Sequence, residues 1–559
     1  MKSFFAAALL LALPLSAAAQ QPEPPFSVVE ATISEMQEAL RTGRVTSRDL
    51  VTQSLIRIAL YEDKLNATMS VNPHALEEAD RLDRERAAGK VRGPLHGIPV
   101  ALKDIIHTTD MPTTGGALAF AGLVPPYEAT LTRNLRDAGA IILAKTGLTE
   151  LANWIGRGMP TNYNSLHGYG FNPYDPRRDP REATGDGRPV LATGGSSSGV
   201  GTAASFWAAN VGTETSGSIL SPASANMLAG IKPTVGRVSR HGIIPITADQ
   251  DTAGPMARTL TDAAIVLGVL EGDEPDPNDS ATTRCDPVAD YTVFLQKDGL
   301  KGARIGIPRA FYWDEYTPPG EERPRGGLGE SHRKVMNDAV AVLKAQGAII
   351  VDPVNPPSVV DQDPDESYLL WGICTSMDQV KERKCSISFG YGMERDFNAW
   401  LESLGDAAPV KTLAELRAWN ERHEKMGTLK YGQALLDYSS AMDQEIFRER
   451  YEHDRARDIE LAGTRGIDAV MKEHRLDALL FPSNWGAAIA ARPGYPSVIV
   501  PFGTIPNAPS TPYPDGFDAK PAPFGVTFTG TACSEPGLLR IAYAFEQATR
   551  KRVPPPLFP

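Results

Sequence analysis

Two short runs rich in glycine and serine, Gly194–Gly199 and Gly212–Ser218, constrain this chain more than any other feature. They lie at either end of one apolar segment, Val200–Val211, which contains no proline and is predicted to be helical. A flexible Gly/Ser linker would not be threaded through such a segment. Glycine-rich turns at both ends of a buried element instead bring backbone N–H groups toward one point, which can hold an anion or a developing oxyanion. A serine placed there can be a nucleophile.

Strands and helices alternate along the rest of the chain. Strands are predicted at 98–106, 140–145, 303–307, 348–351, 476–481 and 497–501. Helices are predicted at 31–62, 75–88, 128–138, 263–270, 332–345 and 534–549, and over most of 410–475. This alternation predicts an α/β fold with a largely covered sheet. No internal repeat or break in composition divides residues 30–559, so we expect a single large domain there.

The N-terminus, residues 1–19, matches a secretory signal peptide. It has one positive charge at Lys2, an apolar run from Phe4 to Leu15 that is too short to span a bilayer, and small residues up to Ala19. We expect cleavage after Ala19 and export to a bacterial periplasm or the extracellular space, with residues 20–29 forming an N-terminal arm. An uncleaved membrane anchor is the alternative, and no other segment is apolar enough to cross a membrane.

The chain contains four cysteines, Cys285, Cys374, Cys385 and Cys533. An oxidising compartment would permit disulfides, and Cys374 and Cys385 are close enough in sequence to pair, which we state as a hypothesis. None of the four lies in a zinc-type pair, and no Walker loop, H-E-x-x-H or Rossmann fingerprint is present. The sequence therefore implies no metal and no redox cofactor. A net charge of −12 also argues against a nucleic-acid partner, which requires a basic face.

Lys103 is the strongest candidate for a catalytic base because it is embedded in the apolar run Ile98–Ile106. Lowering its pKa from about 10.4 toward 7 requires about 4.6 kcal/mol, and desolvation can supply that amount. A neutral lysine amine can then act as a general base. His107 and His241 lie near the glycine-rich loops but have no evident orienting carboxylate, so we expect both to be structural.

Three motifs favour other enzymes. Gly195–Gly199 matches the G-x-S-x-G nucleophile elbow with Ser197 at its centre, but we find no His-Gly-Gly-type oxyanion loop, and histidines are sparse. Ser331–Lys334 matches S-x-x-K and Lys145–Gly147 matches K-T-G, in the reverse of the order found in penicillin-binding enzymes. We interpret the S-x-x-K and K-T-G matches as chance, and the nucleophile elbow is a disfavoured alternative.

Longer motifs around these residues resemble the amidase signature family. They are Gly97–Asp104, Gly194–Gly199, Gly212–Ser218, Gly230–Ser239 and Gln250–Arg258. The resemblance covers about residues 30–553 and implies a mixed β-sheet covered by helices on both faces. Within the family, the chain is most similar to the bacterial peptide amidases. The runs that support this are Gly212–Thr215, Gln250–Arg258 and Gly530–Pro536.

The resemblance implies a Ser–Ser–Lys triad without a cofactor. Carried onto this sequence, Ser218 is the acylating nucleophile, Ser196 the bridging serine and Lys103 the base. The oxyanion hole would be formed by four backbone amides, those of Thr215, Ser216, Gly217 and Ser218. Ser197 and Ser198 then become supporting residues.

The chain also departs from the family's pattern. Ser216 stands where Gly or Asp is usual, and Leu220 replaces an arginine often found two residues after the nucleophile. The spacing between Ser196 and Ser218 is slightly short, which we do not expect to disturb the triad. Residues 157–193 look expanded and irregular. Together with residues 311–330, they are expected to form walls of the substrate pocket.

The resemblance implies a secreted hydrolase of carboxylic amides that works through an acyl-enzyme, with peptide C-terminal amides or related small-molecule amides as substrates. Carbamates and aryl amides are close alternatives. A catalytically inactive binding protein of the same fold is another, although the intact triad residues argue against it. A glutaminyl component of a transamidation complex is disfavoured because export would separate it from tRNA. No membrane partner is expected after signal cleavage, and the oligomeric state is left open.

Overall fold

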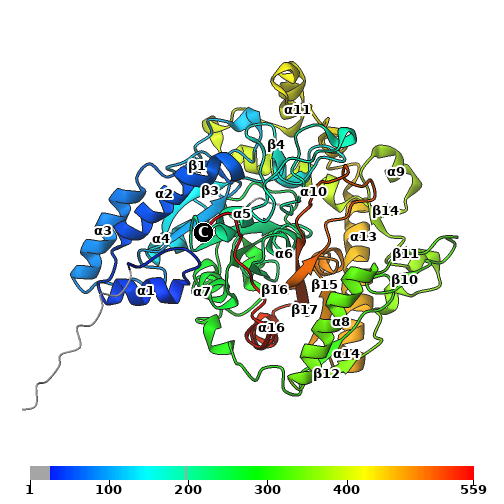
Figure 1. Ribbon diagram of the computed structural model, residues 1–559. Helices are drawn as coiled ribbons and strands as arrows, with labels where there is room; N and C mark the ends of the chain where they lie inside the picture. Colours follow the sequence, from blue (N-terminus) through cyan, green and yellow to red (C-terminus); the bar gives the residue numbers. More distant parts are fainter. Residues whose placement is uncertain (1–24, 196–197) are drawn as a thin grey trace, which may run out of the picture.

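The computed structural model describes residues 25–195 and 198–559 (Figure 1). The predicted signal peptide, Ser196 and Ser197 lie outside these residues. An 11-stranded sheet forms the centre, in the order β1-β3-β2-β6-β8-β7-β16-β17-β15-β9-β12. Its strands are β1 Thr68–Val71, β2 Pro99–Lys103, β3 Ile141–Thr146, β6 Ala209–Glu214, β7 Ala229–Lys232, β8 Thr252–Ala257, β9 Arg304–Gly306, β12 Ile349–Val351, β15 Ala478–Pro482, β16 Ser497–Ile505 and β17 Ala522–Thr529. In the part of the chain that the structure describes, no helix is long and apolar enough to span a bilayer.

The sheet is mixed, as the resemblance implied. Strand β2 runs parallel to β3 and β6, whereas β8 is antiparallel to β6 and β7, and β16 is antiparallel to β17. Two hydrophobic clusters lie on opposite faces: Val100 and Leu102 of β2 belong to one, and the intervening Ala101 belongs to the other. Because successive strand residues point to opposite faces, helices must cover both sides of the sheet.

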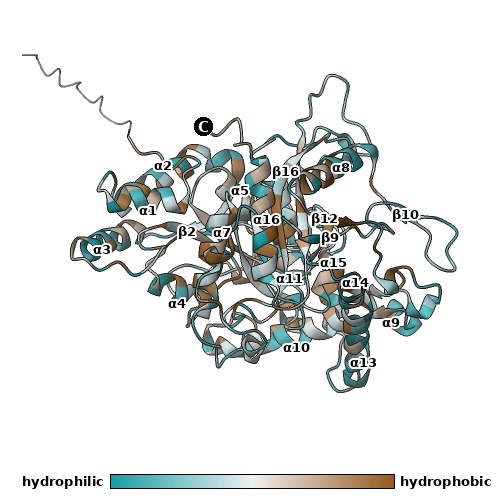
Figure 2. Cartoon of the chain, turned by 90° about the horizontal axis from the view of Figure 1, so that it is seen from below, coloured by the Kyte–Doolittle hydropathy of each residue, from teal (hydrophilic) through white to brown (hydrophobic). Residues whose placement is uncertain are grey.

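The longer helices agree with the sequence pattern, except for the one over residues 388–403, which was not predicted. The longer ones are α1 Ile33–Arg41, α2 Ser47–Leu65, α3 Ala75–Ala87, α4 Thr130–Asp137, α7 Leu260–Glu271, α8 Glu330–Ala345, α10 Ser388–Ser403, α11 Leu413–Arg422, α13 Arg448–Ile459 and α16 Glu535–Thr549. Helices α2 and α3 supply apolar side chains to one cluster, and α4, α7 and α16 supply them to the other. Figure 2 shows largely hydrophilic outer helices, such as α3 and α13, around an apolar interior.

The prediction that Val200–Val211 is one helix is wrong. Helix α5 (Ser198–Ala203) is short, and β6 begins at Ala209. Two buried arginines take carbonyl oxygens that a longer helix would need: Arg57 Nη2 donates to Ala204 O at 2.7 Å, and Arg258 Nη1 donates to Trp207 O at 2.9 Å. The helix therefore ends where side chains from distant segments satisfy its backbone.

Both possible disulfides form, and only one was predicted. The hypothesis that Cys374 pairs with Cys385 is confirmed. Cys285 pairs with Cys533 across a sequence separation of 248 residues, which proximity in sequence could not suggest.

The 157–193 segment is irregular, as predicted, but it is held by repeated ion pairs. An arginine binds the aspartate two residues before it in Asp175–Arg177, Asp179–Arg181 and Asp186–Arg188. Arg177 also packs over Phe517 at 4.3 Å, and Arg181 packs over Tyr513 at 4.9 Å. The segment is thereby attached to the proline-rich loop between β16 and β17.

Candidate active site

Lys103 is the last residue of β2, and its side chain is fully buried. Strand β2 pairs in parallel with β6, with Leu102 opposite Val211, so both strands end at the same edge of the sheet. Lys103 Nζ donates to Thr213 Oγ1 of β6 at 3.0 Å. Burial lowers the pKa of Lys103 to about 8, and the carboxylates of Asp251 and Glu214 oppose that shift. A substantial fraction of the amine is therefore neutral near pH 8 and able to accept a proton.

Ser218 lies in the tight turn that joins β6 to helix α6 (Leu220–Ala225). The buried Glu214 side chain fixes this turn, since its Oε2 accepts hydrogen bonds from Ile219 N at 2.8 Å and Leu220 N at 3.0 Å. Gly217 has φ of +95°, a conformation that L side chains rarely adopt, so the turn requires glycine there.

The four amides named for the oxyanion hole are available as donors. The N–H groups of Thr215, Ser216, Gly217 and Ser218 have no hydrogen-bond acceptor among the described residues. Ser218 itself is partly exposed. A turn with unpaired amides beside a serine is the arrangement that can stabilise a tetrahedral intermediate.

The two glycine-rich loops meet, as the sequence suggested. A Cβ atom added at Gly195 would lie 3.0 Å from Ser218 Oγ, and one added at Gly194 would lie 2.4 Å from the backbone of Pro222 in α6. Thr149 Oγ1 donates to Gly195 O at 3.1 Å and holds the loop from the other side. Ser196 lies outside the described residues, so its role in the triad stays a prediction.

Thr215 is fixed by two residues that sequence reasoning did not single out. Its hydroxyl donates to Asp251 Oδ1, and its carbonyl accepts from Gln250 Nε2 at 3.1 Å. Asp251 Oδ2 also accepts from the backbone N of Ile246 at 2.8 Å and of Thr247 at 3.0 Å. Burial raises the pKa of Asp251 to about 7. The signal was available in the Gln250–Arg258 motif, which we used only to identify the family.

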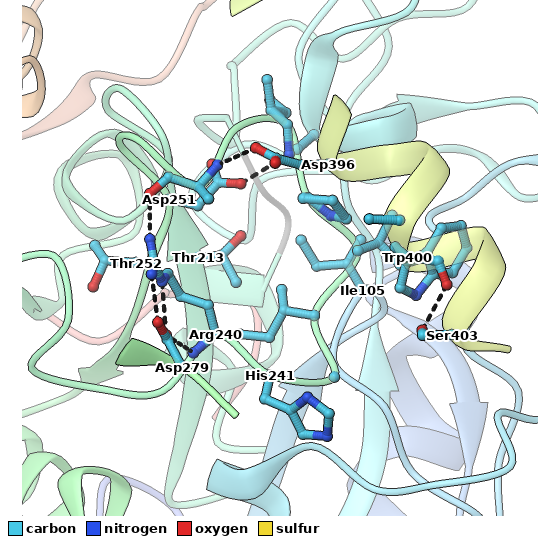
Figure 3. A pocket seen from close by; sticks show the side chains of 18 of the residues that line it. Ile105, Thr213, Arg240, His241, Asp251, Thr252, Asp279, Asp396, Trp400 and Ser403 are labelled. Carbon is cyan, nitrogen blue, oxygen red and sulfur yellow. Dashed lines mark hydrogen bonds and ion pairs between the residues drawn. The ribbon is translucent and has the colours of Figure 1, made fainter. Parts of the chain in front are cut away.

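A cavity of about 400 Å³, the Trp400 cavity, opens beside Thr213 and Thr215 (Figure 3). Most of its walls come from residues 240–252 and from residues 396–403 of α10. The expectation that residues 157–193 and 311–330 line the pocket is wrong for this cavity. The first segment packs against the β16–β17 loop, and the second contains β10 (Glu315–Tyr316) and β11 (Arg325–Gly326), which pair with each other.

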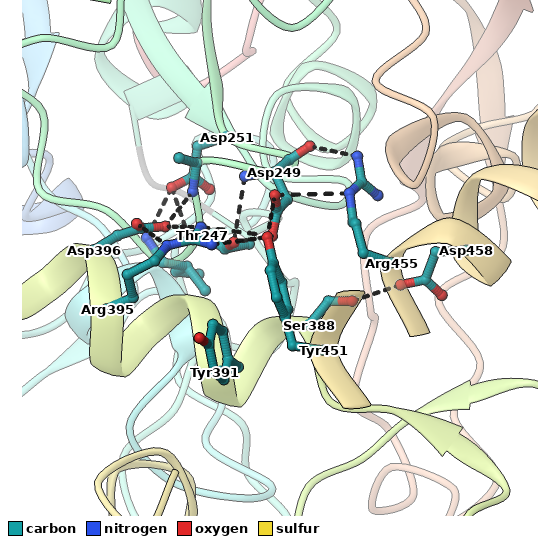
Figure 4. Close-up of polar contacts among 12 residues, drawn as sticks. Thr247, Asp249, Asp251, Ser388, Tyr391, Arg395, Asp396, Tyr451, Arg455 and Asp458 are labelled. Atoms are coloured by element: carbon teal, nitrogen blue, oxygen red, sulfur yellow. Dashed lines mark hydrogen bonds and ion pairs between the residues drawn. The ribbon is translucent and has the colours of Figure 1, made fainter. Parts of the chain in front are cut away.

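Helices α10 and α13 are tied to the 247–251 loop by charged groups (Figure 4). Asp396 of α10 accepts from Ala248 N at 2.6 Å and is paired with the neighbouring Arg395 at 2.7 Å. Asp249 accepts from the hydroxyl of Tyr451 in α13 at 2.9 Å. Charged groups of α10 and α13 therefore hold the 247–251 loop, which lies within the segment that forms one wall of the cavity.

His107 and His241, the histidines near the glycine-rich loops, form no hydrogen bond with a carboxylate of the described residues. His107 is buried, and its Nε2 accepts a hydrogen bond from Trp400 Nε1 at 2.8 Å. Burial lowers the pKa of His107 to about 3, so the ring is neutral. His241 lines the Trp400 cavity and stacks on Tyr127, with ring centroids 5.0 Å apart.

The rival lysine motifs do not form a common site. Lys145 is buried in β3, 3.3 Å from Asp104. Lys334 is exposed on α8, which packs against β12 at the other end of the sheet. No group of three or more metal-ligating side chains occurs within residues 25–195 and 198–559.

Comparisons with known proteins all match amidases. A family model described as Amidase matches residues 49–539. A probable amidase of Arabidopsis thaliana is 33% identical over 95% of this chain and 92% of its own length. The crystal structure of the peptide amidase from Stenotrophomonas maltophilia superposes with a TM-score of 0.77 at 36% identity, covering 94% of this chain and 98% of that one. The structure of an amidase family protein from Bacillus anthracis also gives a TM-score of 0.77, at 30% identity over 94% of this chain and 92% of that one.

Proposed function

The chain belongs to the amidase family and is an amide-hydrolysing enzyme, and on that premise we propose that it works through a Ser218–Ser196–Lys103 triad. The observation that carries this assignment is the position of Lys103, buried on β2 beside β6, the strand that leads into the turn with Ser218 and four amides that have no acceptor among the described residues. A base with a lowered pKa beside a serine and free donors fits acyl transfer.

In the first half-reaction, neutral Lys103 takes a proton through Ser196 from Ser218, whose Oγ attacks the amide carbonyl carbon. The carbonyl oxygen becomes an oxyanion that the amides of Thr215 to Ser218 stabilise. The intermediate collapses as the C–N bond breaks, and the proton held by Lys103 passes to the leaving nitrogen, which departs as ammonia or an amine. Water, deprotonated through the same relay, then hydrolyses the acyl-enzyme and releases the carboxylic acid.

Peptide C-terminal amides are the preferred substrate class. The named activity of the Stenotrophomonas maltophilia neighbour supports this choice. Aryl amides, carbamates and an inactive binding protein of the same fold remain the alternatives.

The direct test is ammonia release from a panel of peptide, fatty and aryl amides. We expect the wild type to deamidate peptide amides and Ser218→Ala to lose at least 99% of that rate. Ser331→Ala, from the rejected S-x-x-K motif, is the matched control and should retain it. A fluorophosphonate probe should modify Ser218, and a folded sample without this adduct would favour an inactive binding protein.

We also propose that the protein is exported. The N-terminal pattern of residues 1–19 and the two disulfides support this, because disulfides persist in oxidising compartments. Sequencing of the mature protein should give an N-terminus at Gln20. An intact Met1 on protein recovered from the cytosol would contradict export.

A further inference from the structure

We propose that the Trp400 cavity holds the side chain of the residue whose amide is hydrolysed, and that it selects a large apolar or aromatic side chain without negative charge. This assignment rests on the proposed function, because it takes the scissile carbonyl to lie at Ser218. Thr213 and Thr215 connect the cavity to the catalytic residues. Both line the cavity, and Thr213 binds Lys103 whereas Thr215 begins the turn that carries Ser218.

The size of the Trp400 cavity suits one side chain. Its volume of about 400 Å³ lies near the lower end of the range for small-molecule sites. A single aromatic side chain fits within such a space, whereas a long extended peptide does not. The rest of a peptide substrate would therefore extend away from this cavity.

The apolar wall is rigid. The Trp400 indole is fixed by its hydrogen bond to His107 Nε2 and packs edge-on against Phe120, with ring centroids 5.4 Å apart. Tyr127 is held by stacking on His241 and by a hydrogen bond between its hydroxyl and Ser403 Oγ at 2.6 Å. A ring that binds here meets a surface that is already ordered, so little conformational entropy is lost on binding.

The charges on the wall disfavour an acidic side chain. Arg240 is the cationic side chain that lines the cavity, but its guanidinium is bound to Asp279, with Nε donating to Oδ2 at 2.8 Å. Asp396 is compensated by Arg395, whereas Asp251 forms no ion pair with any described residue. A substrate carboxylate in the cavity would find no unpaired cation among the residues that line it and would face Asp251, an arrangement that rejects it.

The test measures kcat/KM for four N-acetyl amino-acid amides, those of Phe, Met, Glu and Gly. We expect Phe to exceed Gly, and Met to exceed Glu, by at least tenfold at pH 8, since differences in pocket filling are worth factors of about 10 to 200. The Met and Glu side chains have similar length, so a difference between them reflects polarity and charge and not size.

A variant that fills the cavity tests whether the preference for large side chains arises there. Ala399 is exposed and lines the cavity beside Trp400, so Ala399→Phe should lower the Phe-to-Gly ratio at least tenfold. Ala414→Phe, an exposed site on α11 outside the cavity, is the matched control and should leave the ratio unchanged. Turnover of the Gly amide by each variant reports that the enzyme is folded.

The possible failures are distinguishable. If no amide is hydrolysed, or if Ser218→Ala retains the activity, the proposed function is wrong. If the amides are hydrolysed but Phe and Gly do not differ, if Glu equals Met, or if Ala399→Phe leaves the ratio unchanged, the function stands and the assignment of the Trp400 cavity is overturned.

Discussion

Three lysines in the described part of the chain are completely buried, and their partners distinguish them. Lys145 lies 3.3 Å from the carboxylate of Asp104, and Lys232 donates to the carbonyl of Tyr495 at 2.5 Å. Lys103 donates to the hydroxyl of Thr213 and forms no ion pair with a described residue. Burial lowers the pKa of both Lys103 and Lys232 to about 8, so the pKa does not separate them. Of the three, Lys103 is the one that donates to β6, the strand that leads into the Ser218 turn, and for that reason we propose it as the base.

Replacing Lys103 should separate catalysis from stability. Lys103→Met removes the base but leaves an apolar side chain of similar length, so kcat should fall by about 10² to 10⁴ while the unfolding midpoint is retained. Lys145→Met is the contrasting variant: it leaves Asp104 buried without its cation and should cost about 3–5 kcal/mol of stability. Near-full activity of Lys103→Met would remove Lys103 from the mechanism.

The charge of Asp251 should appear in the pH profile. Only neutral Lys103 accepts a proton, so kcat/KM should rise with pH to about 8 and then level off. The Asp251 carboxylate favours the protonated lysine and raises its pKa, so Asp251→Asn should move this acid limb to lower pH. Thr215→Val removes the hydrogen bond to Asp251 but keeps the Asp251 charge. The acid limb of the pH profile of this variant should not move to lower pH. An unmoved limb in Asp251→Asn would show that Asp251 does not act on Lys103.

The candidate site is formed by two structural elements. One is the pair of adjacent strand ends of β2 and β6, and the other is the glycine-rich loop before α5. The parallel strands bring Lys103 and Thr213 to one edge of the sheet. The loop reaches Ser218 because Gly194, with φ of +87°, packs directly on the backbone of α6. Close approach of two backbones is thus the reason for glycine at this position.

Gly194→Ala should therefore inactivate the enzyme by displacing a loop. Its Cβ would lie 2.4 Å from the backbone of Pro222, so the loop must move away from Ser218 and kcat/KM should fall at least tenfold. Gly89→Ala provides the control, since Gly89 also has a positive φ, +77°, but has no atom within 4 Å of the added Cβ. That variant should cost about 1 kcal/mol of stability and leave kcat/KM intact. Equal activity of the two variants would contradict the role of close packing.

Across the whole molecule, the two disulfides close loops of very different length. Cys285–Cys533 spans 248 residues and joins the segment after α7 to the start of α16, whereas Cys374–Cys385 spans 11 residues. Constraint of the unfolded chain grows with loop length, by about 3 kcal/mol for a loop near 15 residues and about 5 kcal/mol beyond 100.

The double variant Cys285→Ser/Cys533→Ser should therefore lose more stability than Cys374→Ser/Cys385→Ser. Urea unfolding of both variants under identical oxidising conditions measures the difference. Activity at low temperature should persist in each, because neither disulfide touches the Trp400 cavity or the Ser218 turn. A larger loss in the short-loop variant would contradict this ranking.

The amino-acid sequence alone determined what depends on local pattern: the α/β class, most helices and strands, the glycine-rich turns, the apolar setting of Lys103 and the short disulfide. Periodicity, glycine spacing and proximity along the chain carry that information. Tertiary structure decided the rest. Helix α5 ends before the carbonyls of Ala204 and Trp207, which Arg57 and Arg258 bind. Cys285 finds Cys533, and the Trp400 cavity is assembled from residues 240–252 and helix α10. Each depends on contacts between residues far apart in the chain, which only the folded arrangement of the sheet and its covering helices brings together.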